Sequence, residues 1–122
     1  MVKLTYKYLN LQALQETTGG NLAIEIELLE LFNDIVEEYI AILQEELPKE
    51  NWKGLSDATH KIKPNITLFG IHSMEPVIED LEMHLKHQEN PQQIHALVNH
   101  VIDVFKEVKT EIGLELDSMG KN

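Results

Sequence analysis

From Asn51 to Gly70 the chain reads NWKGLSDATHKIKPNITLFG. Mostly apolar side chains recur here at alternating steps of three and four, which is the spacing of one buried stripe on an α-helix. The stripe consists of Trp52, Leu55, Thr59, Ile62, Ile66 and Phe69. His60 points about 130° away from the mean direction of the stripe, because successive helical residues are rotated by about 100°. The segment therefore predicts a core-forming helix that displays one histidine to solvent.

The segments on either side of this helix show the same helical periodicity. Their expected ranges are residues 11–17, 22–47, 74–88 and 91–113. No segment alternates apolar and polar residues for long enough to predict a strand. Short connections between long amphipathic helices favour antiparallel neighbours. We therefore predict an all-α fold, an antiparallel up-down-up-down four-helix bundle with a short extra N-terminal helix.

Residues that begin or end helices set the expected boundaries. Short polar side chains accept hydrogen bonds from the first free N–H groups of a helix, and glycine adopts the left-handed conformation that ends one. The expected N-caps are Asn10, Asn21, Asn51 and Ser73, and the expected stops are Gly19, Gly20, Gly70 and Gly113. Residues 113–122 are then expected to form a frayed tail.

Length and charge limit the classes of function. A chain of 122 residues suits one domain, so we expect a single domain over residues 1–122. The formal net charge of −11 disfavours nucleic acid and anionic membranes as partners. The absence of cysteine excludes disulfides and thiolate chemistry. The N-terminus lacks the apolar core of a signal peptide, and we expect a cytoplasmic protein.

The sequence ATHKIKPNITLFG resembles the signature of histidine-containing phosphotransfer (HPt) domains. In that family, the histidine is followed by an apolar residue at two positions on, lysine at three and glycine at ten. The matching residues here are His60, Ile62, Lys63 and Gly70. Further similarity lies in Phe32, in the Asn51-Trp52 start of the histidine helix, and in residues 74–82. The resemblance thus extends over most of the chain.

The resemblance implies a phosphorelay carrier without autonomous kinase activity. His60 would accept a phosphoryl group from the aspartyl phosphate of a response-regulator receiver domain and pass it to another receiver. Lys63 would compensate the phosphoryl charge, and Glu82 would orient the imidazole. A hybrid histidine kinase is a further possible partner. No intrinsic cofactor or metal is expected, because the receiver would bring Mg²⁺, and a monomer is expected.

The match departs from the family directly after the histidine. Family members usually have glycine four residues on and small residues next, whereas this chain has Pro64, Asn65 and Ile66. Proline has no N–H to bond the His60 carbonyl and its ring crowds that carbonyl, so we expect a kink there. We also expect a partly apolar docking surface bordered by Phe32, Val36 and Leu68.

Three other functions compete with phosphotransfer. A buried di-metal site in a helical bundle needs Glu-x-x-His pairs, which do not occur. The dimerisation helix of a sensor kinase has an acid after its histidine and a proline five residues on, whereas Lys61 follows His60 and Pro64 comes at four. The main alternative is a structural or adaptor bundle that has lost phosphotransfer. This alternative stays open because Pro64 departs from the family pattern directly after the histidine.

Overall fold

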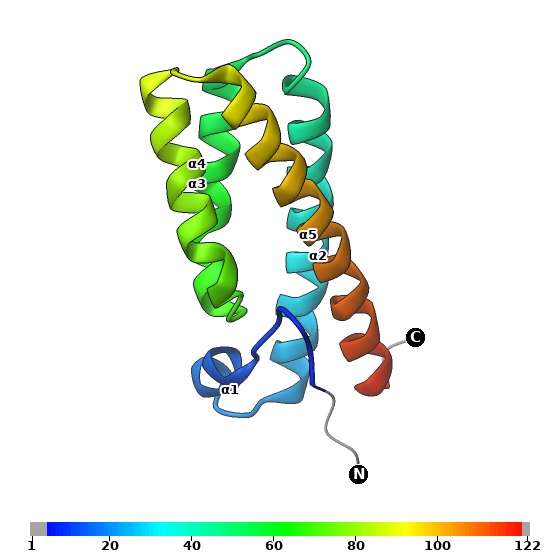
Figure 1. The fold of residues 1–122 in the computed structure, drawn as a ribbon. Helices are drawn as coiled ribbons and strands as arrows, with labels where there is room; N and C mark the ends of the chain where they lie inside the picture. Colours follow the sequence, from blue (N-terminus) through cyan, green and yellow to red (C-terminus); the bar gives the residue numbers. More distant parts are fainter. Residues whose placement is uncertain (1–4, 121–122) are drawn as a thin grey trace.

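The protein is described by a computed structural model over residues 5–120, and these residues form helices and connecting turns without strands. The helices are α1 (Gln12–Thr18), α2 (Leu22–Glu46), α3 (Trp52–Leu68), the short 3₁₀ helix η1 (His72–Met74), α4 (Glu75–His87) and α5 (Pro91–Ser118). The helices α2 to α5 alternate in direction, and α5 returns to pack against α2 (Figure 1). The predicted four-helix bundle with an extra N-terminal helix is confirmed.

One hydrophobic core runs along the bundle axis. Leucine, isoleucine and valine from all four long helices fill it. Phe32 of α2 stacks on Phe69 after α3, with ring centroids 4.0 Å apart. The edge of Tyr39 meets Phe105 of α5 at 5.5 Å. These contacts fix how each helix is rotated about its axis, and they therefore decide which side chains reach solvent.

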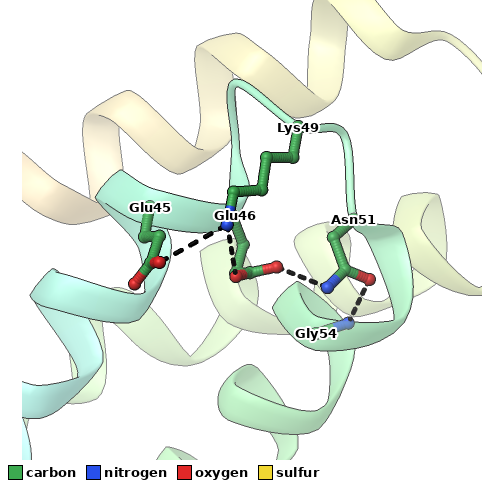
Figure 2. Close-up of polar contacts among 5 residues, drawn as sticks. All are labelled: Glu45, Glu46, Lys49, Asn51 and Gly54. Atoms are coloured by element: carbon green, nitrogen blue, oxygen red, sulfur yellow. Dashed lines mark hydrogen bonds and ion pairs between the residues drawn. The ribbon is translucent and has the colours of Figure 1, made fainter.

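Asn51 caps α3 as predicted, and Figure 2 shows the network around it. Its Oδ1 accepts from the Gly54 N–H at 3.1 Å, and its Nδ2 donates to Glu46 of α2. Lys49 pairs with both Glu45 and Glu46 across the same turn. A Cβ on Gly54 would come within 2.8 Å of the Asn51 amide nitrogen, so a larger residue at position 54 would displace the capping side chain. The network fixes where α3 starts relative to α2.

The other predicted N-caps have mixed outcomes. Asn21 caps α2 by accepting from the Ile24 N–H at 3.1 Å. The N-cap of α1 is Leu11 and not Asn10 as predicted, although the Asn10 side chain accepts from the Gln12 N–H at 3.1 Å. The prediction for Ser73 is wrong, because this residue lies inside η1 and α4 begins without a side-chain cap.

Gly70 ends α3, as predicted, and must be glycine for two reasons. Its φ of 69° is in the left-handed region, and an added Cβ would lie 2.2 Å from the Asn10 carbonyl oxygen. The Asn10 N–H also donates to the Phe69 carbonyl at 3.0 Å. The N-terminal chain therefore passes directly over the end of the histidine helix.

The predicted end of the last helix at Gly113 is wrong. Helix α5 continues to Ser118, so residues 114–118 are helical rather than a frayed tail, while residues 121–122 lie outside the described range. The extension is packed: the Tyr6 hydroxyl donates to Glu115 at 2.7 Å, and Leu116 lies against the core. A single glycine inside a helix costs only about 1 kcal/mol, which such contacts can outweigh.

The segment from Tyr6 to Asn10, here named the N-terminal strap, is clamped by one buried carboxylate. Glu111 of α5 accepts from the backbone N–H groups of Lys7, Tyr8 and Leu9 at 3.0–3.3 Å. Three donors on one carboxylate satisfy a charge that would otherwise be costly to bury. The strap and α1 close the lower end of the bundle in Figure 1. No helix in residues 5–120 has the length and apolarity needed to cross a membrane.

Candidate functional site

His60 lies in the middle of α3 with its side chain 82% exposed. Its neighbours Thr59 and Ile62 are buried in the core, so their packing fixes the rotation of the helix. The predicted display of His60 on the solvent-facing side is confirmed. A neutral imidazole in this position has a nitrogen lone pair available near neutral pH.

Glu82 of α4 reaches across to His60 and Lys63 on α3. Its Oε1 is 2.8 Å from the Lys63 Nζ, and its Oε2 is 3.5 Å from the His60 Nδ1. The first distance is that of a charge-assisted hydrogen bond, and the second exceeds the usual hydrogen-bond length. The structure thus brings together all three residues that the sequence singled out. Their pairing through one carboxylate was not predicted.

The Lys63 ammonium is held in its charged form. Its hydrogen bond to Glu82 and the attraction of the Glu82 charge raise the pKa of Lys63, with a smaller contribution from Glu79. Lys63 is therefore a fixed positive charge beside His60 through the physiological pH range.

An open groove of about 510 Å³ lies between α3 and α4 beside the histidine. Its lining residues are His60, Lys63, Pro64, Ile66, Thr67, Glu75, Ile78 and Glu79. Glu75 and Glu79 are not among the site residues predicted from the sequence. A signal was present, because residues 75, 79 and 82 follow the i, i+4, i+7 spacing of one helix face. The site therefore combines one lysine with three carboxylates.

Helix α3 continues through Pro64 to Leu68. Pro64 has no N–H for the His60 carbonyl, so that helical hydrogen bond is missing, yet the turns on either side remain helical. Pro64 is exposed and lines the groove. The missing hydrogen bond therefore does not end the helix at the histidine, and the expected kink stays a prediction.

A second, smaller groove of about 200 Å³ lies between α2 and α3. It is lined by Ile35, Glu38, Tyr39, Ile42, Ala58, Lys61, Ile62 and Asn65. The prediction that Phe32 and Val36 border a docking surface is wrong, because both are fully buried in the core. Phe32 is held inside by its stack on Phe69. Leu68 is half-buried on α3.

Within residues 5–120, no group of three or more histidine, aspartate or glutamate side chains is arranged to hold a metal ion. Two histidines outside the site have partners within the protein. His95 lies 3.0 Å from Glu50, and His84 lies 2.9 Å from the Asp80 carbonyl oxygen.

Comparison with known proteins identifies a matching family and a structural neighbour. The sequence profile of the Hpt domain matches residues 27–115. The crystal structure of the HPT domain of an Hpt sensor hybrid histidine kinase from Shewanella superimposes with a TM-score of 0.77. The match covers 90% of this chain and 94% of that chain at 16% sequence identity, which is a likeness of fold. No curated protein matches the chain.

Proposed function

This chain belongs to the Hpt domain family, whose role is histidine phosphotransfer in two-component signalling, and we propose that it is a phosphorelay carrier with His60 as its phosphoryl acceptor. The observation that supports this assignment best is the exposed imidazole of His60 with the Glu82 carboxylate facing its Nδ1. A carboxylate at Nδ1 favours the tautomer with the proton on that nitrogen. The lone pair is then on Nε2, which becomes the nucleophile.

The proposed reaction is a phosphoryl exchange between two side chains. The Nε2 lone pair of His60 attacks the phosphorus of a receiver aspartyl phosphate. A P–N bond forms, the acyl phosphate P–O bond breaks, and the receiver aspartate leaves as a carboxylate. The Nδ1 proton stays on the ring, and Glu82 orients the imidazole by facing that nitrogen. The reverse reaction passes the phosphoryl group to another receiver.

Lys63 and the receiver divide the remaining tasks. Lys63 places one positive charge at the edge of the groove beside His60, where phosphoryl oxygens would lie. Further stabilisation of the transferring group, including Mg²⁺, is assigned to the receiver. His60 therefore acts as a covalent carrier, and catalysis requires the complex.

The receiver is proposed to cover both grooves that flank His60. The groove between α2 and α3 has apolar walls from Ile35 and Ile42, with Lys61 and Asn65 on its α3 side. Ile35 and Ile42 are partly buried, and Leu31, one turn before Ile35 on α2, is exposed. Apolar contacts ringed by polar groups are typical of protein–protein interfaces.

A transfer experiment tests the assignment. Receiver domains from the source organism are phosphorylated with acetyl phosphate, freed of it, and incubated with the wild-type chain and the His60→Gln variant. The expected result is acid-labile phosphohistidine on the wild type and none on His60→Gln. The matched control is His100→Gln, an exposed histidine on α5, which is expected to label like the wild type.

The same experiment tests the adaptor alternative. A chain that binds phosphorylated receivers but takes up no label would be a phosphotransfer-inactive adaptor. Equal labelling of wild type and His60→Gln would place the acceptor on another residue. Either result would overturn the assignment of His60.

A further inference from the structure

We propose that Glu82 sets how strongly His60 retains a phosphoryl group, by competing with that group for the single ammonium of Lys63. The inference rests on the proposed function, because it concerns the phosphorylated state of His60. It gives Glu82 a regulatory role beyond orientation of the imidazole. Glu82 is a positioning residue in this proposal, since it acts on the phosphoryl group through Lys63.

The geometry shows that Lys63 is already occupied. Its Nζ is 2.8 Å from Glu82, whereas the carboxylate is 3.5 Å from His60. Glu82 is 23% exposed and its partner Lys63 is 41% exposed, so water screens this pair less than it screens most surface pairs. The contact between Glu82 and Lys63 is therefore the tighter of the two.

The net negative charge around His60 increases the competition between Glu82 and a phosphoryl group for Lys63. Lys63 is accompanied by Glu75 and Glu79 in the groove and by Glu82 itself. One positive and three negative charges give a local formal charge of −2. A phosphoryl group adds about −1.5 to −2 more charge at neutral pH. The only lysine lining the groove must then be shared between the phosphoryl oxygens and Glu82.

Because Lys63 is shared between Glu82 and the phosphoryl group, it affects the equilibrium of phosphoryl transfer as well as the rate. Transfer between receiver aspartate and His60 exchanges one P–O bond for one P–N bond, with the receiver as the only co-reactant. An interaction that weakens phosphohistidine moves the equilibrium toward the receiver. An ion pair between Lys63 and Glu82 in the unphosphorylated state is such an interaction, because phosphorylation must weaken it. Glu82 would thus keep His60 a ready phosphoryl donor.

The Glu82→Gln variant tests the proposal. An amide oxygen can still accept from the His60 Nδ1–H, but it no longer holds Lys63 by charge. One equivalent of phosphorylated receiver is mixed with each variant, and phosphohistidine at equilibrium is measured by ³¹P NMR. We expect the equilibrium constant to shift toward phosphohistidine by roughly fivefold, the size expected for releasing one partly exposed charge. Loss of orientation alone would slow transfer in both directions without this shift.

Two controls isolate Lys63 as the intermediary. Asp103→Asn removes one exposed negative charge from α5 and is expected to leave the equilibrium unchanged. In a Lys63→Met background, Glu82→Gln is expected to lose most of its effect. A shift that persists in this background would mean direct repulsion by Glu82, and it would overturn the competition for Lys63.

The remaining outcomes separate the inference from the proposed function. A labelled wild type with an unshifted or oppositely shifted Glu82→Gln variant overturns the inference alone. Absence of label on His60 in the wild type overturns the proposed function, and the inference with it. Circular dichroism of each variant confirms that the bundle is folded before transfer is measured.

Discussion

Tyr39 and Thr59 are two polar residues buried inside the bundle next to the site. The tyrosine hydroxyl and the Thr59 Oγ1 are 2.9 Å apart, so each satisfies the other. Thr59 directly precedes His60 in α3, and Tyr39 belongs to α2. This hydrogen bond connects the turn of α3 that carries His60 to α2, and it helps to fix the rotation of α3 about its axis.

Burial of Tyr39 predicts a loss of stability at alkaline pH. Burial raises the pKa of Tyr39 well above its ordinary range, whereas in the unfolded chain it ionises near pH 10. The folded state therefore keeps the proton, and this stabilisation is complete below about pH 10 and lost as the pH rises further. Urea denaturation from pH 8 to 11 should show a steeper loss for the wild type than for Tyr39→Phe. Parallel curves would contradict the prediction.

Ile62 tests whether the histidine helix is anchored by its buried stripe. Its side chain is fully buried, two residues after His60. Ile62→Ala should lower the free energy of unfolding by about 2–5 kcal/mol through lost burial and a cavity. Lys61→Ala, at the exposed neighbouring position, should change it by less than about 0.5 kcal/mol. Urea unfolding followed by circular dichroism measures both, and equal effects would mean that α3 is rotated differently.

Pro64 lies inside α3, where proline lowers the stability of the helix. Pro64→Ala supplies an N–H for the His60 carbonyl and removes the crowding of the ring, so it should raise stability by about 1–3 kcal/mol. Pro76→Ala is the matched control, because Pro76 lies in the first turn of α4 where no such bond is lost. Thermal unfolding compares the two, and a destabilised Pro64→Ala would show that the proline is structurally required.

The N-terminal strap depends on one side chain of α5. Glu111→Ala removes the acceptor of three backbone N–H groups and should cost about 1–3 kcal/mol. Hydrogen exchange should then speed up at residues 7–9 but not in α4. Glu107→Ala is the control, since Glu107 accepts from the Tyr8 hydroxyl at the surface, whereas Glu111 accepts from the strap backbone. Unchanged exchange at the strap in Glu111→Ala would show that other contacts hold it.

These elements also show which features of the fold can be predicted from sequence. Asn51 and Gly70 mark helix ends through local chemistry, so both were identified correctly. The end of α5 was misplaced because it depends on Tyr6, a residue 109 positions away from Glu115. Local patterns carry no information about such contacts, and Gly113 alone suggested a stop.

The candidate site was predictable to a similar extent. The periodicity of α3 predicted the exposure of His60, and the family resemblance pointed to Lys63 and Glu82. The ion pair between the last two could not be predicted, because it depends on the packing of α3 against α4. Phe32 was placed on the wrong side because α2 has apolar residues around much of its circumference, and only packing selects the buried ones.

Across the whole molecule, the four helices form a ring in which α3 and α5 are diagonal. Within the described residues, the backbone of α3 lies against α2 and α4, whereas α5 meets α3 through the edge-on contact of Trp52 with His95. A partner that reaches His60 on α3 therefore approaches the side of the bundle where α3 lies between α2 and α4. The outer face of α5 is left outside this proposed complex.

Two exposed leucines on different helices test whether the receiver binds beside α3 and not at the outer face of α5. Leu31 of α2 is 55% exposed and Leu114 of α5 is 51% exposed. Replacing either by glutamine should leave stability nearly unchanged. Leu31→Gln should weaken receiver binding by about 1–2 kcal/mol through lost apolar contact, which raises the KM for transfer about five- to thirtyfold. Leu114→Gln should transfer like the wild type, and equal effects of the two substitutions would mean that the receiver approaches His60 from a different direction.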